Sequence, residues 1–565
     1  MPILIDKVRI YNFRSLKKCA ITLEPVILLI GANNSGKTSF LRALNLVLGV
    51  GQKRIVPEDF YIGENGTEES KEIIIDVHIV PTEADGSRID SFSDEWTEKQ
   101  FAELISIDAQ EKQYFSFRTK VVYDILKGEY SVKRYKIKDW IEAEDWEIQK
   151  HNEEMKQYLD GFPLFFMDAQ RDIVLDLRDR NSYFGRLLSK IKIGDGLLKE
   201  IEEKIKTINQ SIVLNSPELA SIKVELQKLK NTVSTVAEIE LNPVNERIRD
   251  IHRGISISLQ DLSSESFSLE YHGMGTRSWA TVLTYGAFIA WQYKKMEQEN
   301  QPYHTILALE EPEAHLHPHA QRTLYNQLSE MKGQKIISTH SPFIASQCQL
   351  HEMRHFKKQK SYAEITSFDV SILNGEEKRK LRKEVFNTRG EFLFAHTVVL
   401  SEGETEEQAL PLFAEKHWGK HPYEIGISFV GVGGAGNYAP FLRILKQFSI
   451  NWFIFSDGES DPVEKVKNSL ISVGISTNPM PSNVIIIPNN ENLEGYLISL
   501  GYQIEIRGAI MQYWESNGKI KNDTHREAKR MKVESWSDEV LKKYMVDNKT
   551  KLSSIYSSII SSVEV

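Results

Sequence analysis

Short apolar runs recur along the chain, and each run ends at a polar or glycine-rich turn. Residues 26–30 and 306–309 are wholly aliphatic, which is typical of strands buried on both faces of a parallel sheet. Residues 39–46 follow a glycine-rich turn and carry apolar side chains at helical spacing. The pattern therefore predicts an α/β fold in which strands, turns and helices alternate.

The same strand pattern returns in the carboxyl-terminal third of the chain. Apolar runs at 397–400, 427–430, 452–455 and 484–487 predict a second unit with parallel strands. Residues 375–383, before these runs, are dense in charge and predict a helical connection. A chain of 565 residues is too long for one ordinary core, so two or three domains are expected.

A helical region is predicted between the two halves of the first unit. Residues 197–212 and 219–229 have helical apolar spacing, and Asn215-Ser216-Pro217 separates them. We expect these two helices to form an insertion in the first unit that is available for dimerisation. Packing of these helices on their own domain is the alternative.

The glycine-rich turn after residues 26–30 matches a nucleotide-binding loop. Gly31-Ala32-Asn33-Asn34-Ser35-Gly36-Lys37-Thr38 fits G-x-x-x-x-G-K-[ST], and it stands between a strand and a helix as the motif requires. Its backbone amides and the helix N-terminus would stabilise phosphates, Lys37 would reach the β- and γ-phosphates, and Thr38 would ligate Mg²⁺. The residues expected to contact ATP here are Asn33, Asn34, Ser35, Gly36, Lys37, Thr38 and Ser39.

Two acids follow the apolar run at 306–309, which is the Walker B pattern. Glu310 is expected to hold Mg²⁺, directly or through water, and Glu311 to polarise the attacking water. Glu310 stands where Asp is usual but keeps the charge, and a capped strand end is the alternative. His340 follows another short strand and is the expected sensor of the γ-phosphate.

In the carboxyl-terminal unit, acids recur after successive strands. The carboxyl ends of parallel strands form one edge of an open sheet, where ligands bind. Converging carboxylates repel one another unless a cation neutralises them, and Mg²⁺ or Mn²⁺ prefers such oxygen ligands. The residues expected to meet at a divalent-metal site are Glu402, Glu406, Asp457, Glu459 and Glu494.

Composition narrows the classes of protein. Cys19 and Cys348 are the only cysteines, which excludes a disulfide framework and a cysteine-based zinc site and fits a reducing compartment. The first residues do not form a signal peptide, and no run is apolar enough to span a bilayer, so a cytoplasmic protein without membrane contact is expected. The net charge of −9 means that any nucleic-acid contact needs a local basic patch.

The first unit resembles an ABC-type ATPase head of the SMC and RecF kind. Residues 10–15 (IYNFRS) resemble the opening strand of that group, and 272–278 (HGMGTRS) resemble its degenerate signature motif. In such ATPases the signature of one subunit closes over ATP held by another, so the resemblance implies a homodimer or larger assembly. The segment departs from the common LSGGQ form, so the expected signature contact with ATP lies within 273–278, with Gly275 as the candidate. Gln170 is the candidate Q-loop residue, with a polar turn after a strand as the alternative.

The second unit resembles a Toprim domain, a Rossmann-like fold. That family has a Glu after its first strand and D-x-D after a later strand; here Glu402 and Asp457 match, and Glu459 replaces the second Asp. The order of ATPase then Toprim resembles the OLD (overcoming lysogenization defect) family of ATP-dependent nucleases. This resemblance implies Glu402 and Asp457 as catalytic residues and a supporting lysine near the carboxyl end, best matched by Lys549, with Lys551 as the alternate.

These predictions give one organisation and two functions. The resemblance implies an ATP-regulated, Mg²⁺- or Mn²⁺-dependent DNA endonuclease, commonly an antiphage effector that a protein or nucleic-acid partner controls. The alternative is a RecF- or SMC-like repair or sensing ATPase whose Toprim-like half only binds. The expected segments are 1–190 and 256–375 for the ATPase, 191–255 for the helical insertion, 376–395 for a linker and 396–565 for the Toprim domain.

Overall fold

The structure is a computed structural model of the 565-residue chain. The chain forms two compact units. Unit 1 contains Met1–Gly49, Arg54–Ala169 and Phe288–Val565, and unit 2 contains Val50–Lys53 and Gln170–Ala287. The structure describes residues 2–49, 55–64, 71–169 apart from 125, 127, 152, 157 and 158, 195–219 apart from 218, 258–259, 267–373, 375–381 and 390–502.

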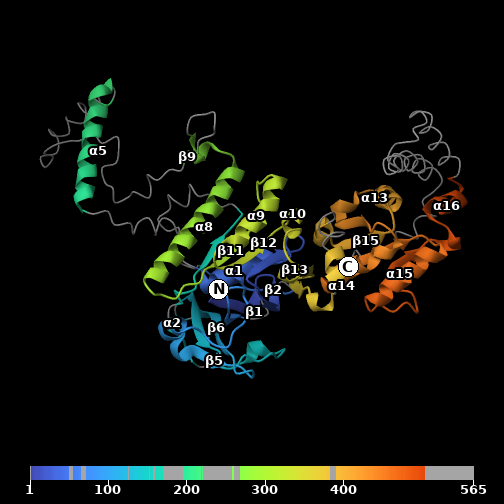
Figure 1. Ribbon diagram of the computed structural model, residues 1–565, viewed down its shortest axis with the longest axis horizontal. Coiled ribbons are helices and arrows are strands. Elements are labelled where there is room, and N and C mark those ends of the chain that lie inside the picture. The colour runs from blue at the N-terminus through green and yellow to red at the C-terminus, as the bar shows by residue number, and fades with distance from the viewer. Residues whose placement is uncertain are drawn as a thin grey trace. The chain divides into compact units, whose positions relative to one another are not determined.

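A six-stranded sheet lies in the first lobe of unit 1, the lobe that carries the glycine-rich loop. Its order is β14-β13-β3-β12-β11-β8, and every neighbouring pair is parallel except β13 with β14. The predicted strands at 26–30 and 306–309 are confirmed as interior members of this sheet, and Figure 1 labels the neighbouring β11 and β12. The strands are β3 (Val26–Ile30), β8 (Leu164–Met167), β11 (Ile306–Glu310), β12 (Gln334–Ser338), β13 (Met353–Gln359) and β14 (Tyr362–Ser367).

Helices accompany this sheet in the order that a phosphate-binding fold requires. Helix α1 (Lys37–Leu48) starts directly after the glycine-rich loop and buries Phe40, Leu41 and Leu44. The predicted strand–turn–helix is therefore confirmed. The further helices of this lobe are α9 (Pro318–Glu330), α10 (Pro342–Ala345) and α11 (Gly375–Lys380), with a 3₁₀ turn η11 (Gly390–Phe394) before the second domain.

A second sheet of the lobe is antiparallel, in the order β2-β1-β4-β6-β5, with β7 also paired to β6. Apolar side chains from three of its strands, such as Val8, Ile75 and Phe117, belong to one hydrophobic core that also includes Leu41 of α1. The elements are β1 (Ile3–Phe13), β2 (Leu16–Thr22), β4 (Glu72–Pro81), α2 (Asp94–Trp96), β5 (Ile105–Ile107), β6 (Gln113–Asp124) and β7 (Glu129–Lys136).

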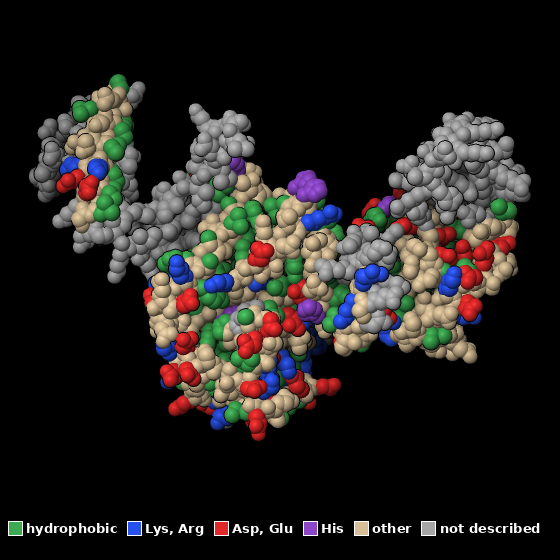
Figure 2. All heavy atoms as spheres, viewed as in Figure 1, with side chains coloured by type: hydrophobic (Ala, Val, Ile, Leu, Met, Phe, Trp, Pro, Cys, Tyr) green, Lys and Arg blue, Asp and Glu red, His purple; other side chains and the backbone are tan. Residues whose placement is uncertain are grey.

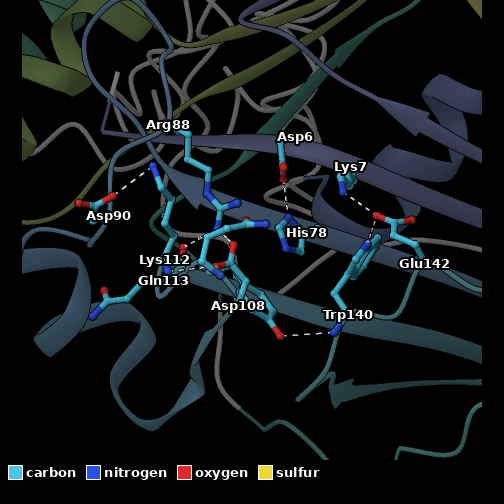
Figure 3. Close-up of polar contacts among 12 residues, drawn as sticks. Asp6, Lys7, His78, Arg88, Asp90, Asp108, Lys112, Gln113, Trp140 and Glu142 are labelled. Carbon is cyan, nitrogen blue, oxygen red and sulfur yellow. Dashed lines mark hydrogen bonds and ion pairs between the residues drawn. The ribbon is translucent and has the colours of Figure 1, made fainter.

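Polar side chains of this antiparallel sheet hold the segment that follows β7. The Arg118 guanidinium makes two hydrogen bonds to the Asp76 carboxylate, at 2.7 and 2.8 Å, and also donates to the carbonyl of Trp146. Figure 3 shows neighbouring contacts, in which Lys7 and the Trp140 indole both reach Glu142. On the face in Figure 2, acidic and basic side chains are intermixed over the lobe that carries β5 and β6.

Unit 2 confirms part of the predicted helical insertion. Helix α5 (Asp195–Asn215) includes the residues expected to be helical at 197–212, whereas most of 219–229 lies outside the described residues. A short hairpin pairs β9 (Ser258–Leu259) with β10 (Phe267–Ser268). Helix α8 (Met274–Gln298) begins in unit 2 and continues into unit 1.

The carboxyl-terminal domain has a four-stranded sheet in the order β16-β15-β17-β18, and all pairs are parallel. All four predicted strands are confirmed. Val399, Phe429 and Phe453 share its core with Phe413 and Leu497 from the helices. The elements are β15 (Thr397–Ser401), α13 (Glu404–Trp418), β16 (Ile427–Gly431), α14 (Tyr438–Gln447), β17 (Asn451–Ser456), α15 (Ser460–Ser472), β18 (Val484–Ile486) and α16 (Leu493–Leu497).

Within the described residues, no helix has both the length and the apolar character needed to cross a bilayer.

Burial of His304 makes stability depend on pH. Its side chain is 0% exposed just before β11, and burial lowers its pKa to about 3. An unfolded histidine gains a proton below about pH 6.5, so this site loses stability as pH falls from there toward 3. Between about pH 7.5 and 5.5 the loss is on the order of 1 kcal/mol. We predict that His304→Leu removes this part of the acid sensitivity in denaturant titrations; parallel pH curves for the two proteins would contradict it.

Candidate functional site

The nucleotide-binding loop depends on two glycines with positive φ. Gly31 has φ 133° and lies so close to β13 that a Cβ would stand 2.1 Å from the Phe356 carbonyl oxygen. Gly36 has φ 106° and directly precedes α1. Larger side chains would be strained at both positions, so these glycines set the path of the loop.

Lys37 is buried at the start of α1 and folds back onto the loop. Its Nζ donates to the carbonyl oxygens of Gly31 and Ala32, at 2.8 Å each. Burial lowers the Lys37 pKa to about 8, against the opposing influence of Glu311, Glu313 and Glu310. A phosphate group would give this ammonium the negative partner that the carbonyls only partly replace.

The parallel sheet brings the Walker B acids and His340 to the same edge. Ser338 at the end of β12 pairs with Leu29 of β3 and Glu310 of β11. Thr38 donates its hydroxyl hydrogen bond to Glu310, so the two predicted Mg²⁺ ligands are in contact. Their hydroxyl and carboxylate oxygens are of the type that Mg²⁺ binds.

His340 faces the second Walker B acid. Its Nε2 lies 3.7 Å from Oε1 of Glu311, and burial lowers the His340 pKa to about 4, with a further contribution from Lys37. The imidazole is therefore neutral near pH 7, and the contact is not an ion pair. A neutral ring can donate a hydrogen bond from one nitrogen, as a γ-phosphate contact requires.

The other predicted ATP contacts fall in different places. Asn33 and Asn34 are exposed at the loop, Ser35 is buried, and the Ser39 hydroxyl lies 3.0 Å from that of Ser15. Gly275 lies in the first turn of α8 within unit 2. Gln170 lies outside the described residues, and all these ATP-binding roles stay predictions.

In the carboxyl-terminal domain, Glu402 and Asp457 follow the two central, adjacent strands. β15 and β17 pair in parallel up to Ser401 and Phe455, so both acids stand at the carboxyl edge of the sheet. Asp457 Oδ1 accepts from the Leu493 amide at the start of α16, at 3.1 Å. The predicted convergence of acids at the carboxyl edge of this sheet is therefore present for Glu402 and Asp457.

Glu402 is suited to a cation. Its Oε2 is buried, and no hydrogen-bond partner for it occurs among the described residues. Burial raises the Glu402 pKa, and Glu459 and Asp461 add to the rise, while a hydrogen bond from the Ala435 backbone and the charge of Lys465 act in the opposite direction. A buried carboxylate oxygen without a donor is stabilised by a hard metal ion, so the residues fit a divalent metal.

The remaining predicted metal ligands do not complete a cluster. Glu406 Oε2 accepts from the Gly403 amide at 2.9 Å, which gives this side chain a role in capping α13. Glu459 is the N-cap residue of α15, and Glu494 lies in α16, where its side chain is not described. Across the described parts of the chain, no three His, Cys, Asp or Glu residues come close enough to hold one ion. Lys549 lies outside the described residues.

The structure also adds two residues to those expected from the sequence. Glu313, three residues after Glu310, is buried and bonded to the segment that carries His340. The sequence feature that could have indicated Glu313 is a third acid just past the Walker B pair. The Phe394 ring lies 6.2 Å from the His340 ring, a contact that has no motif to announce it.

Two known families match this chain. A family described as AAA ATPase domain matches residues 4–345, more than half of the 565-residue chain. The chain belongs to this ATPase family. A second family, described as overcoming lysogenization defect protein-like TOPRIM domain, matches residues 393–458. This match includes Glu402 and Asp457 and confirms the predicted order of an ATPase domain followed by a Toprim domain.

Relatives of this ATPase match over most of their length. OLD nuclease of Thermus scotoductus is 24% identical, with 82% of this chain and 83% of the relative covered. Endonuclease GajA of Bacillus cereus is also 24% identical, with 80% and 75% covered. Among solved structures, the Smc head domain of Pyrococcus furiosus bound to part of ScpA matches with TM-score 0.35 and 15% identity, covering 68% of this chain and 99% of that one.

We predict that Lys37→Ala reduces ATP hydrolysis by the ATPase at least about 10²-fold, because the cation expected on the phosphates is lost. Turnover of ATP by purified protein measures this. Lys335→Met is the matched control, since Lys335 is also buried with a pKa lowered to about 8 but donates to the carbonyls of Ser329 and Met331. Wild-type turnover by folded Lys37→Ala would show that the loop is not the ATP site.

Proposed function

We propose that this chain is an ATP-regulated DNA endonuclease that depends on a divalent metal. One observation carries the proposal: the chain has two separate strand edges with functional acids, Glu310 and Glu311 in the ATPase and Glu402 and Asp457 in the Toprim domain. Two relatives that match most of the chain are named OLD nuclease and Endonuclease GajA. A role in antiphage defence, which the OLD resemblance implies, belongs to the same proposal.

In the ATPase centre, Lys37 and the loop amides bind the phosphates of ATP. Thr38 and Glu310 are suited to hold Mg²⁺, which neutralises charge on the β- and γ-phosphates when bound. Glu311 orients the attacking water and accepts its proton. His340, neutral near pH 7, donates a hydrogen bond to the γ-phosphate.

In the Toprim centre, Glu402 and Asp457 would hold a divalent ion that acts on a phosphodiester of DNA. Such an ion would supply an activated water and stabilise the leaving oxygen. The raised pKa of Glu402 is consistent with this role, because a bound cation would favour its ionised form. Glu406, Glu459, Glu494 and Lys549 are further candidates for this centre.

Regulation by ATP is supported by the segment that joins the two domains. η11 packs on α10, which directly follows His340, and the Phe394 ring lies 6.2 Å from the His340 imidazole. Three residues later the chain enters β15, which ends one residue before Glu402. A change at His340 on ATP binding would therefore act first on the segment that leads into the Toprim sheet.

A second function is a repair or sensing ATPase whose Toprim-like half binds DNA or a partner without cutting. The specific observation in its favour is the capping bond of Glu406, together with the lack of a three-residue metal group in the part of the chain that the structure describes. Cleavage assays separate the two functions.

We predict that Glu402→Ala and Asp457→Ala each abolish metal-dependent cleavage of plasmid DNA and leave ATP hydrolysis within about twofold of wild type. The reason is that each side chain belongs to the Toprim edge and not to the ATPase edge. Cleavage is followed on gels with Mg²⁺ or Mn²⁺, and chelation is the blank. Glu424→Ala, an exposed acid before β16, is the matched control.

Undiminished cleavage by either variant would remove that residue from the centre. No cleavage by the wild type on plasmid, linear or single-stranded DNA would favour the binding function.

We predict that Phe394→Ala removes the effect of ATP on DNA cleavage while ATP hydrolysis stays within about twofold of wild type. Loss of the ring would separate His340 from the segment that enters β15. Cleavage rates with and without ATP measure this coupling. Tyr423→Ala, which removes an exposed aromatic ring of the Toprim domain, is the control. A wild-type response to ATP in Phe394→Ala would contradict the proposed coupling.

We predict that the protein is at least a homodimer. A complete ATP site in ABC-type heads needs the loop of one subunit and the signature of another, and this chain has one copy of each, around Lys37 and at 273–278. Light scattering with and without ATP measures the mass in solution. A monomer that hydrolyses ATP at a specific rate independent of protein concentration would rule out the composite site.

A further inference from the structure

Glu313 is a buried carboxylate between β11, the Walker B strand, and the segment that follows β12 and carries His340. It lies just beyond β11, and its residue is 8% exposed. Its Oε1 accepts two hydrogen bonds, one from the Thr339 hydroxyl at 2.6 Å and one from the His340 backbone amide at 2.8 Å. One oxygen atom thus fixes two consecutive residues after the end of β12.

The bond from Thr339 continues into the next helix. The same hydroxyl that donates to Glu313 accepts from the Ser341 amide at 2.9 Å, and the Ser341 hydroxyl caps α10. The Thr339 amide donates to the Leu29 carbonyl of β3 at 3.1 Å. The backbone on both sides of His340 is therefore held, by the Glu313 carboxylate at His340, by the Leu29 carbonyl at Thr339 and by the Thr339 hydroxyl at Ser341.

These backbone contacts affect the position of the His340 imidazole. Its Nε2 lies 3.7 Å from Glu311 Oε1. Because His340 follows the end of β12 by two residues, this distance depends on how the backbone after β12 is held. Glu313 also acts on Lys37, whose ammonium form its charge favours. The Glu313 carboxylate thus influences both residues expected to contact the phosphates, the cationic Lys37 and the neutral His340, although Glu313 is not itself such a contact.

Burial of this carboxylate costs free energy. Glu313 Oε2 is buried, and no donor to it is found in the described part of the structure. Burial raises the Glu313 pKa, with opposing hydrogen bonds from Thr339 and His340. A glutamine would accept both bonds from Thr339 and His340 without burying a charge, so the two hydrogen bonds are what the site uses.

We propose that Glu313 is a positioning residue of the ATP-hydrolysis centre, which orients His340 through the hydrogen bonds to Thr339 and to the His340 amide. The inference rests on the proposed function, because it needs His340 to act on bound ATP. Glu313 itself does not touch the reacting atoms.

The test compares ATP turnover and the KM for ATP in Glu313→Gln, Glu313→Ala, His340→Ala and the double variant Glu313→Ala/His340→Ala. Glu313→Gln keeps the acceptor and should stay within about threefold of wild-type kcat. Glu313→Ala should lower kcat about tenfold or more while KM changes less than about threefold. The double variant should be no slower than His340→Ala alone, within about twofold, because both changes remove the same contribution.

Two further variants keep the test decisive. Thr339→Val removes one of the two hydrogen bonds and should lower kcat about threefold or more, with no further loss in the His340→Ala background, even if Glu313→Ala folds poorly. Asp76→Asn disturbs another buried carboxylate, on β4 and paired with Arg118, and should lower thermal stability without lowering kcat.

The inference is overturned if folded Glu313→Ala turns over ATP as the wild type does, or if its effect multiplies with that of His340→Ala. Unchanged turnover in Thr339→Val would overturn it as well. Failure of the proposed function looks different, because Lys37→Ala would then hydrolyse ATP normally. If Lys37→Ala is inactive and Glu313→Ala is normal, the ATPase assignment stands and only the role of Glu313 falls.

Discussion

The parallel pairing of β12 with both β3 and β11 is the constraint on which the ATPase centre depends. Ser338 is in register with Leu29 on one side and Glu310 on the other, so three strand ends reach the same edge. The phosphate loop, the acids and His340 are each within a few residues of those ends. Hydrogen bonds between backbones, rather than contacts between the catalytic side chains, bring them together.

Burial then sets the charge state of the residues gathered there. Lys37 has its pKa lowered to about 8 and His340 to about 4, in both cases chiefly by desolvation. The lysine therefore keeps most of its charge near neutral pH, whereas the histidine is a neutral donor. Burial acts in the same way at the Toprim edge, where it raises the pKa of Glu402. Desolvation thus disfavours the charged form at both edges, and a bound ligand of opposite charge would favour it.

Much of this could be predicted from the sequence, because aliphatic runs followed by glycine or acids are strong local signals. The strands at 26–30 and 397–400, and the positions of Glu310 and Asp457 at strand ends, follow from such signals. The roles of Glu313 and Phe394 do not, since each depends on a residue from another element, Thr339 or His340. Glu406 shows the reverse case: its place after β15 suggests a ligand, but its carboxylate caps α13.

Two independent metal-dependent centres in one chain would give two separable classes of bound Mn²⁺, which electron paramagnetic resonance can count. We expect Mn²⁺ bound without nucleotide to be lost in Asp457→Ala and kept in Thr38→Ala. Additional Mn²⁺ should bind with a non-hydrolysable ATP analogue, and should be lost in Thr38→Ala and kept in Asp457→Ala. Loss of both classes of Mn²⁺ in either single variant, or the absence of any nucleotide-independent Mn²⁺, would contradict the account.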